Sequence, residues 1–163
     1  MLLPIYIYGH PILRKVSEDI TPEYEGLSKL LDDMWQTMYE SDGVGLAAPQ
    51  IGKNIRIFVI DGSPFEELDP ACKDFKKAFI NAHILERTGE DVPFNEGCLS
   101  IPGIHEDVMR KDRIKIAYRD ENWVEHVEEF TGTRARIVQH EYDHLDGIMF
   151  TDHLSALKKR LLK

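Results

Sequence analysis

The chain has 163 residues with 20 basic and 29 acidic side chains, which give a formal net charge of −9, and it contains two cysteines. This length favours a single domain over residues 1–163 that needs no disulfide framework. The acidic balance excludes a general nucleic-acid-binding protein, because phosphate contacts require a basic face. No apolar run approaches the ~20 residues that cross a bilayer, and the first residues lack the features of a signal peptide. We therefore expect a cytoplasmic protein.

The first predicted element is an amphipathic helix. Thr21 and Pro22 indicate its start, because threonine is a favoured N-cap and proline is tolerated in the first helical turn. Apolar residues then recur with the 3.6-residue period and predict a buried helix face. These residues are Leu27, Leu30, Leu31, Met34, Trp35 and Met38. The glycine-rich residues 42–52 predict an irregular segment whose backbone can approach another group closely.

The middle of the chain predicts strands. Residues 55–60 are rich in β-branched side chains, and residues 78–85 form a second apolar run. Between them, residues 61–77 indicate a polar loop with room for a helical turn. Residues 113–118 and 123–130 flank a short polar turn and predict a β-hairpin.

The end of the chain predicts two helices. Thr131 or Thr133 is suited to cap a helix that reaches Asp146 and is closed by Gly147. A short basic helix then covers residues 154–162. Together the elements predict an α+β fold with mixed, largely antiparallel sheets packed around the helix that ends at Asp146. An amphipathic helix near the N-terminus and a short C-terminal helix complete this fold.

The strongest functional signal is the segment His140-Glu141-Tyr142-Asp143-His144. Residues four apart share one face of a helix, so both imidazoles can point at one metal ion with Glu141 beside them. Catalytic zinc-type sites use three protein ligands and keep one position open for water. The usual third ligands of metalloproteases are absent. One metalloprotease pattern has a third histidine six residues after the second, but this chain has Phe150 there. Another uses a glutamate further along the chain, but no glutamate follows Glu141. The search for the third ligand then points upstream, to Cys98 or Cys72.

Three segments resemble the signature motifs of the peptide deformylase family. They are Gly43-Val44-Gly45-Leu46-Ala47-Ala48-Pro49-Gln50, Glu96-Gly97-Cys98-Leu99-Ser100 and Gln139-His140-Glu141-Tyr142-Asp143-His144-Leu145-Asp146-Gly147. They occur in the family's order, and the resemblance runs from Tyr8 to Phe150. It implies a hydrolase that removes the N-formyl group from the N-terminal formyl-methionine of newly synthesised polypeptides and releases formate.

The resemblance implies that Cys98, His140 and His144 bind one divalent metal ion. Iron(II) is the usual metal of the family, and zinc, nickel or cobalt also suits thiolate and imidazole donors. The cation lowers the pKa of its bound water, and the resulting hydroxide attacks the formyl carbonyl. Glu141 is then the general base and acid, which takes a proton from the water and later delivers one to the leaving amine.

Further roles follow from the same resemblance. The side-chain amide of Gln50 and the backbone N–H of Leu99 stabilise the oxyanion that forms on the formyl oxygen. Gly45 offers backbone hydrogen bonds to an extended substrate, and an apolar pocket receives the methionine side chain. That pocket is formed by Val44, Phe94, Ile137 and the aliphatic stem of Arg136.

The C-terminal segment is positively charged, in contrast to the acidic chain as a whole. Residues 153–163 hold Lys158, Lys159, Arg160 and Lys163 and no acidic side chain. In relatives the C-terminal helix contacts the ribosome, so the resemblance implies the same contact for this basic segment. The expected partners are therefore formyl-methionyl nascent peptides and the ribosome, without sequence-specific nucleic-acid binding and without a membrane.

Two other functions remain open from the residues alone. One is a zinc-dependent peptidase that cuts internal peptide bonds, which the missing downstream ligand disfavours. The other is a non-catalytic metal-binding or ribosome-associated module on the same fold, which the presence of Glu141 disfavours. The sequence leaves open which metal is loaded, the role of Cys72, and the preference for residues after formyl-methionine.

Overall fold

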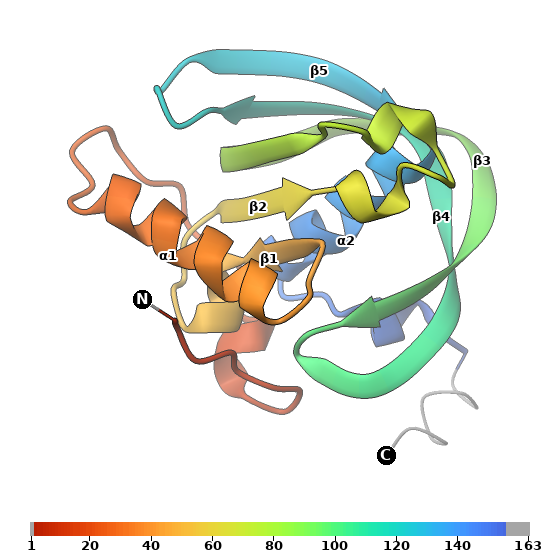
Figure 1. Ribbon diagram of the computed structural model, residues 1–163, viewed down its shortest axis with the longest axis horizontal. Coiled ribbons are helices and arrows are strands. Elements are labelled where there is room, and N and C mark those ends of the chain that lie inside the picture. Colours follow the sequence, from red (N-terminus) through yellow and green to blue (C-terminus); the bar gives the residue numbers. More distant parts are fainter. Residues whose placement is uncertain (1, 156–163) are drawn as a thin grey trace.

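The computed structural model describes residues 2–155, which form an α+β fold with one five-stranded sheet (Figure 1). The strands are β1 (Gly45–Ala47), β2 (Ile57–Asp61), β3 (Lys76–Cys98), β4 (Ile101–Arg119) and β5 (Glu125–Thr131), and they lie side by side in this order. The helices are α1 (Leu27–Glu40) and α2 (Gly132–Leu145). Short 3₁₀ turns cover Pro11–Arg14, Ala48–Ile51, Ser63–Phe65, Pro70–Cys72 and Phe150–His153.

The two helices cover opposite faces of the sheet near β1 and β2 (Figure 1). Side chains of β2 alternate between two apolar clusters, with Phe58 and Ile60 in the cluster that includes α2 residues. Ile57 and Val59 belong to the cluster that includes α1 residues. Because both faces are buried, β2 reads as a continuous apolar run rather than as an alternating one. The predicted stripe of α1 also packs here, and Leu31, Met34 and Met38 are buried in it.

The first helix begins later than predicted. α1 starts at Leu27, behind Gly26 with a φ of 75° in the left-handed region. Thr21 and Pro22 instead form a turn in which the Tyr24 N–H donates to the Thr21 carbonyl (3.0 Å). Proline is favoured at the second position of such a turn as well as at a helix start, so these two residues fit both structures. The prediction of a helix start at Thr21 is therefore wrong.

The second helix differs from the prediction at its N-terminal end and agrees with it at its C-terminal end. The Thr131 side chain makes no capping hydrogen bond. The Asp69 carboxylate, from the loop after β2, instead accepts a hydrogen bond from the Thr133 backbone N–H (3.3 Å). A negative charge at this end of a helix is favoured by the helix dipole. At the other end Gly147 has a φ of 74°, which agrees with the predicted glycine stop.

β3 and β4 extend beyond the sheet as a long curved ribbon (Figure 1). They pair in antiparallel register, with four register shifts that bend the pair. The ribbon closes in a turn at Leu99 and Ser100, which sets Cys98 opposite Ile101. The five strands pair in antiparallel fashion throughout, and parallel pairing within residues 2–155 is confined to an isolated bridge between Glu18 and Ile55. The expected antiparallel pairing is therefore confirmed, and the expectation that the sheets are mixed is wrong.

The hairpin predicted around residues 120–122 is confirmed as β4 and β5. The predicted C-terminal helix over residues 154–162 lies outside the described residues, apart from Leu154 and Ser155. Across residues 2–155, no helix has both the length and the apolar character needed to cross a membrane.

Candidate metal centre

The end of β3 and the last turns of α2 bring three metal-binding side chains together. The i, i+4 spacing places His140 and His144 on one face of α2. The turn of the ribbon brings Cys98 Sγ to 3.4 Å from His144 Nε2. One donor atom from each of these three residues lies within 4.8 Å of the other two. A thiolate and two imidazoles in this arrangement can converge on a single cation.

Cys72, the other cysteine considered for this role, has a different environment. Its side chain is fully buried in the apolar cluster between the sheet and α2. Burial raises the pKa of the Cys72 thiol, which favours the neutral form. A buried neutral thiol behaves as a small apolar side chain. Among the described residues, Cys98 is the cysteine that lies with the two histidines.

Charge around Cys98 favours its metal-binding form. Burial by itself raises the pKa of the thiol, but the neighbouring imidazoles of His144 and His140 outweigh it and lower the pKa well below its ordinary value. For His140, burial lowers the pKa, but hydrogen bonds to Cys98 and Glu96 outweigh it and raise the pKa well above the ordinary value. The thiolate is the form of cysteine that coordinates metals.

Glu141 is enclosed beside these ligands. The residue is 5% exposed, and burial raises the pKa of its carboxyl group. Its Oε1 atom lies 3.8 Å from His140 Nε2. Its Oε2 atom is buried and has no hydrogen-bond partner among the described residues. A carboxylate with a raised pKa and one uncommitted oxygen can exchange a proton with a molecule bound in the site.

Gln50 is held so that its amide donor faces the same centre. Its Oε1 atom accepts a hydrogen bond from the Ala47 backbone N–H (2.9 Å). This contact orients Nε2 toward Ser100 Oγ (3.1 Å) and Cys98 Sγ (3.5 Å). The side chain is 1% exposed, so its orientation is fixed by the surrounding protein.

These residues lie at a cavity of about 440 Å³. Ten of the eleven residues predicted for the site line it: Val44, Gly45, Gln50, Phe94, Cys98, Leu99, Arg136, Ile137, His140 and Glu141. The eleventh, His144, is 1% exposed. The sequence did not indicate Phe65, which also lines the cavity and meets the Phe94 ring edge-on at 5.8 Å. Phe65 ends the short 3₁₀ turn Ser63–Phe65 between β2 and β3, and no local sequence signal marks it as a site residue.

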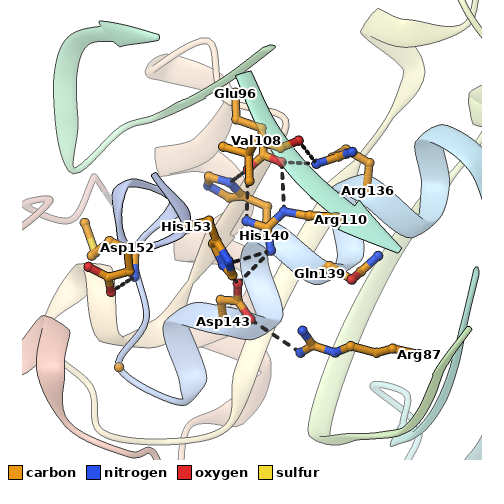
Figure 2. A network of polar contacts seen from close by, with 12 residues as sticks. Arg87, Glu96, Val108, Arg110, Arg136, Gln139, His140, Asp143, Asp152 and His153 are labelled. Carbon is orange, nitrogen blue, oxygen red and sulfur yellow. Dashed lines mark hydrogen bonds and ion pairs between the residues drawn. The ribbon is translucent and has the colours of Figure 1, made fainter. Parts of the chain in front are cut away.

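A buried polar network surrounds the first histidine and was also missed from the sequence (Figure 2). Glu96 Oε1 lies 2.8 Å from His140 Nδ1, so the carboxylate orients the ring. The same carboxylate accepts hydrogen bonds from Arg110 and Arg136. Burial by itself raises the pKa of Glu96, but the hydrogen bonds from His140 and Arg110 lower it well below its usual range. Its position two residues before Cys98 is the signal that could have identified it.

Comparison with known proteins gives one consistent result. A family model described as polypeptide deformylase matches residues 2–160. The peptide deformylase of Christiangramia forsetii is 55% identical over 170 residues, which cover 100% of this chain and 87% of that protein. The crystal structure of peptide deformylase from Thermotoga maritima is 39% identical, with a TM-score of 0.85 over 95% of this chain and 99% of that one. A Synechococcus elongatus peptide deformylase in complex with actinonin is 35% identical, with a TM-score of 0.85 over 98% of this chain and 83% of that one. The chain belongs to the polypeptide deformylase family.

Proposed function

We propose that this chain is a metal-dependent hydrolase that removes the N-formyl group from the N-terminal methionine of newly synthesised polypeptides and releases formate. The observation that carries the proposal is the group Cys98, His140 and His144, gathered beside the buried Glu141 at a cavity. Family membership supports the same reaction. The reaction adds water across the formyl amide, so one C–N bond breaks and a free amine forms.

The donor set fits one divalent cation. A thiolate and two imidazoles supply three ligands, and a catalytic site keeps a further position open for water or substrate. Iron(II) is the metal that we propose, and zinc, nickel or cobalt can use the same donors. Such a cation, when bound, polarises the formyl oxygen and lowers the pKa of water. Cys98, as a thiolate, makes the site soft and sensitive to oxidation.

Glu141 moves the protons in this scheme. Its raised pKa and free Oε2 suit it to accept a proton from the attacking water. It then delivers a proton to the amine nitrogen as the C–N bond breaks. Because the side chain is buried, few water molecules compete for that proton.

Gln50 and Leu99 are the proposed donors to the formyl oxygen when it becomes negatively charged. The Gln50 amide already directs Nε2 toward Cys98, so a carbonyl beside the metal ligands would lie within its reach. The backbone N–H of Leu99 follows Cys98 directly in the chain. Two donors fixed before the reaction stabilise the oxyanion without reorganisation.

The cavity wall is suited to an apolar side chain. Val44, Phe94, Ile137 and Arg136 line it. The guanidinium of Arg136 donates to Glu96 (2.7 Å), so its charge is paired with that carboxylate. Gly45 in β1 presents its backbone to the same cavity. A methionine side chain with an extended backbone fits these features.

The proposal is tested with protein purified without oxygen and loaded with iron(II) or nickel(II). We expect stoichiometric formate and free amine from formyl-Met-Ala-Ser, and no cleavage of internal peptide bonds in the unblocked peptide. Absence of formate from metal-loaded protein would contradict the proposal. Internal cleavage in place of deformylation would identify a peptidase.

A further inference from the structure

Arg110 joins the two elements that carry the candidate metal ligands (Figure 2). It lies on β4 and is 3% exposed. Its Nε and Nη2 atoms donate to both oxygens of Glu96 on β3, at 2.8 and 3.0 Å. Its Nη1 atom donates to Asp143 on α2 at 2.7 Å. One guanidinium therefore spans from the end of the ribbon to the last turns of the helix.

Each of the two acids adjoins the candidate ligands. Glu96 precedes Cys98 by two residues and lies 2.8 Å from His140 Nδ1. Asp143 directly precedes His144. The position of Cys98 relative to the two histidines thus depends on how β3 is held against α2, and Arg110 contacts both.

Stability alone is a weak reason for this arrangement. Side chains of Arg110, Glu96 and Asp143 are 2%, 4% and 1% exposed, so all three charges have lost most of their hydration. Replacing such a buried ion cluster by apolar side chains is often neutral or stabilising in other proteins. What the cluster provides is a fixed geometry, because the planar bidentate contact with Glu96 uses Nε and Nη2 and thereby directs Nη1 toward Asp143.

We propose that Arg110 is a positioning residue, which holds the ribbon end and α2 in the register that lets Cys98, His140 and His144 converge on one metal ion. The inference rests on the proposed function, since it assumes that these three residues bind the metal. It predicts that the fork of Arg110, and not only its positive charge, is required for metal affinity.

The other partners of Glu96 and Asp143 allow the role of Arg110 to be tested by substitution. Without Arg110, Glu96 still pairs with Arg136 and His140, and Asp143 still pairs with His153 (2.8 Å) and Arg87 (3.4 Å). Neither carboxylate would be left unpaired, so a loss of metal binding would report geometry rather than an isolated buried charge.

The variants Arg110→Lys and Arg110→Met are compared with wild type by cobalt(II) titration and chelator competition. We expect both variants to bind cobalt about 10- to 100-fold more weakly, the usual effect of removing a group that orients metal ligands. We also expect a weaker thiolate-to-cobalt absorption band. The matched control is Arg87→Gln, which removes another partner of Asp143 and leaves the contacts of Arg110 in place. Its cobalt affinity should stay within about threefold of wild type, because Arg110 and His153 remain.

A second control separates position from stability. Met38→Ala destabilises the cluster between α1 and the sheet, which contains no α2 residue, and should leave cobalt affinity unchanged. If Arg110→Met does not fold, the cobalt affinities of Arg110→Lys and Asp143→Asn are compared with that of wild type instead. Unchanged affinity in the folded variants, with lower thermal stability only, would overturn the inference. Failure of wild type itself to bind cobalt through Cys98 would instead overturn the proposed function.

Discussion

The backbone of Gly45 lies directly against the side chain of Glu141. A Cβ atom added at Gly45 would stand 2.6 Å from Glu141 Cγ and 2.8 Å from Oε1. Both distances are shorter than van der Waals contact, so a side chain at position 45 and the present Glu141 conformation exclude each other. β1 therefore forms a wall that fixes where the carboxylate can lie.

The first prediction follows from this contact. Gly45→Ala should displace the Glu141 carboxylate and lower kcat about 100-fold, at the lower end of the loss expected when a general base is removed. KM should change little, because alanine keeps the backbone groups proposed to bind substrate. Metal content should stay at the wild-type level. The measurement is steady-state kinetics together with metal analysis of the same preparation.

Leu46→Ala is the matched control for Gly45→Ala. Leu46 is the next residue of β1, but its side chain packs in the cluster on the α1 side of the sheet. Its truncation should cost about 2–5 kcal/mol of unfolding free energy and leave kcat near wild type. Wild-type turnover in Gly45→Ala would show that Glu141 can move without consequence.

The second prediction concerns Glu141 itself. Glu141→Gln keeps the size of the side chain and removes its ability to accept a proton. Turnover should fall by about 10²- to 10⁴-fold while one metal ion per chain is retained. Formate release and metal content measured on one sample check both parts. Loss of metal along with activity would indicate that Glu141 acts as a ligand.

Much of the fold follows from the pattern of apolar residues. The buried face of α1 was predictable because its side chains repeat with the helical period, and β2 was predictable because it is a short continuous apolar run rich in β-branched residues. The outer parts of β3 and β4 were not, because their side chains are largely exposed and charged and the strands are held mainly by each other. The start of α1 was misplaced because Thr21-Pro22 suits a turn as well as a helix.

The residues of the candidate site were also only partly predictable from the sequence. His140, Glu141 and His144 could be grouped from spacing alone, because a helix converts spacing into a shared face. The choice between Cys98 and Cys72 needed the resemblance or the fold, since nothing local links either cysteine to a distant helix. Arg110 and Asp143 were missed because a buried ion pair and an exposed one look identical in a sequence.

The third prediction separates the two cysteines. Cys98→Ala should reduce bound metal far below one ion per chain and leave the fold intact. Cys72→Ala should retain the metal and lower the unfolding free energy by about 1 kcal/mol, because it removes a fully buried side-chain group from the core. Metal analysis after anaerobic purification and urea unfolding check the pair. Metal retained in Cys98→Ala but lost in Cys72→Ala would reverse the assignment.

The fourth prediction concerns a hydrogen bond between α1 and β2, away from the cavity. The Tyr39 hydroxyl donates to Asp61 Oδ2 at 2.7 Å. Burial and this bond raise the pKa of Tyr39 to about 12. For Asp61, burial raises the pKa, but hydrogen bonds from Ser63 and Tyr39 outweigh it and lower the pKa below its ordinary value. The bond requires a protonated tyrosine, and it is strongest when the aspartate is ionised.

The two pKa shifts determine how folding stability changes at high pH and at low pH. The raised pKa of Tyr39 gives stability that is complete below the ordinary tyrosine pKa of about 10 and lost as pH rises through about 12. The lowered pKa of Asp61 gives stability that is present above about pH 4 and lost as pH falls through its folded value. Because Tyr39 is 44% exposed, solvent weakens this bond, and Tyr39→Phe should cost about 0.5 kcal/mol at neutral pH and less toward either extreme. Urea unfolding of wild type, Tyr39→Phe, Asp61→Asn and the double variant across pH measures the coupling energy between the two side chains. A coupling energy near zero at neutral pH would show that the bond contributes nothing, and a coupling energy that does not change with pH would contradict the predicted pH dependence.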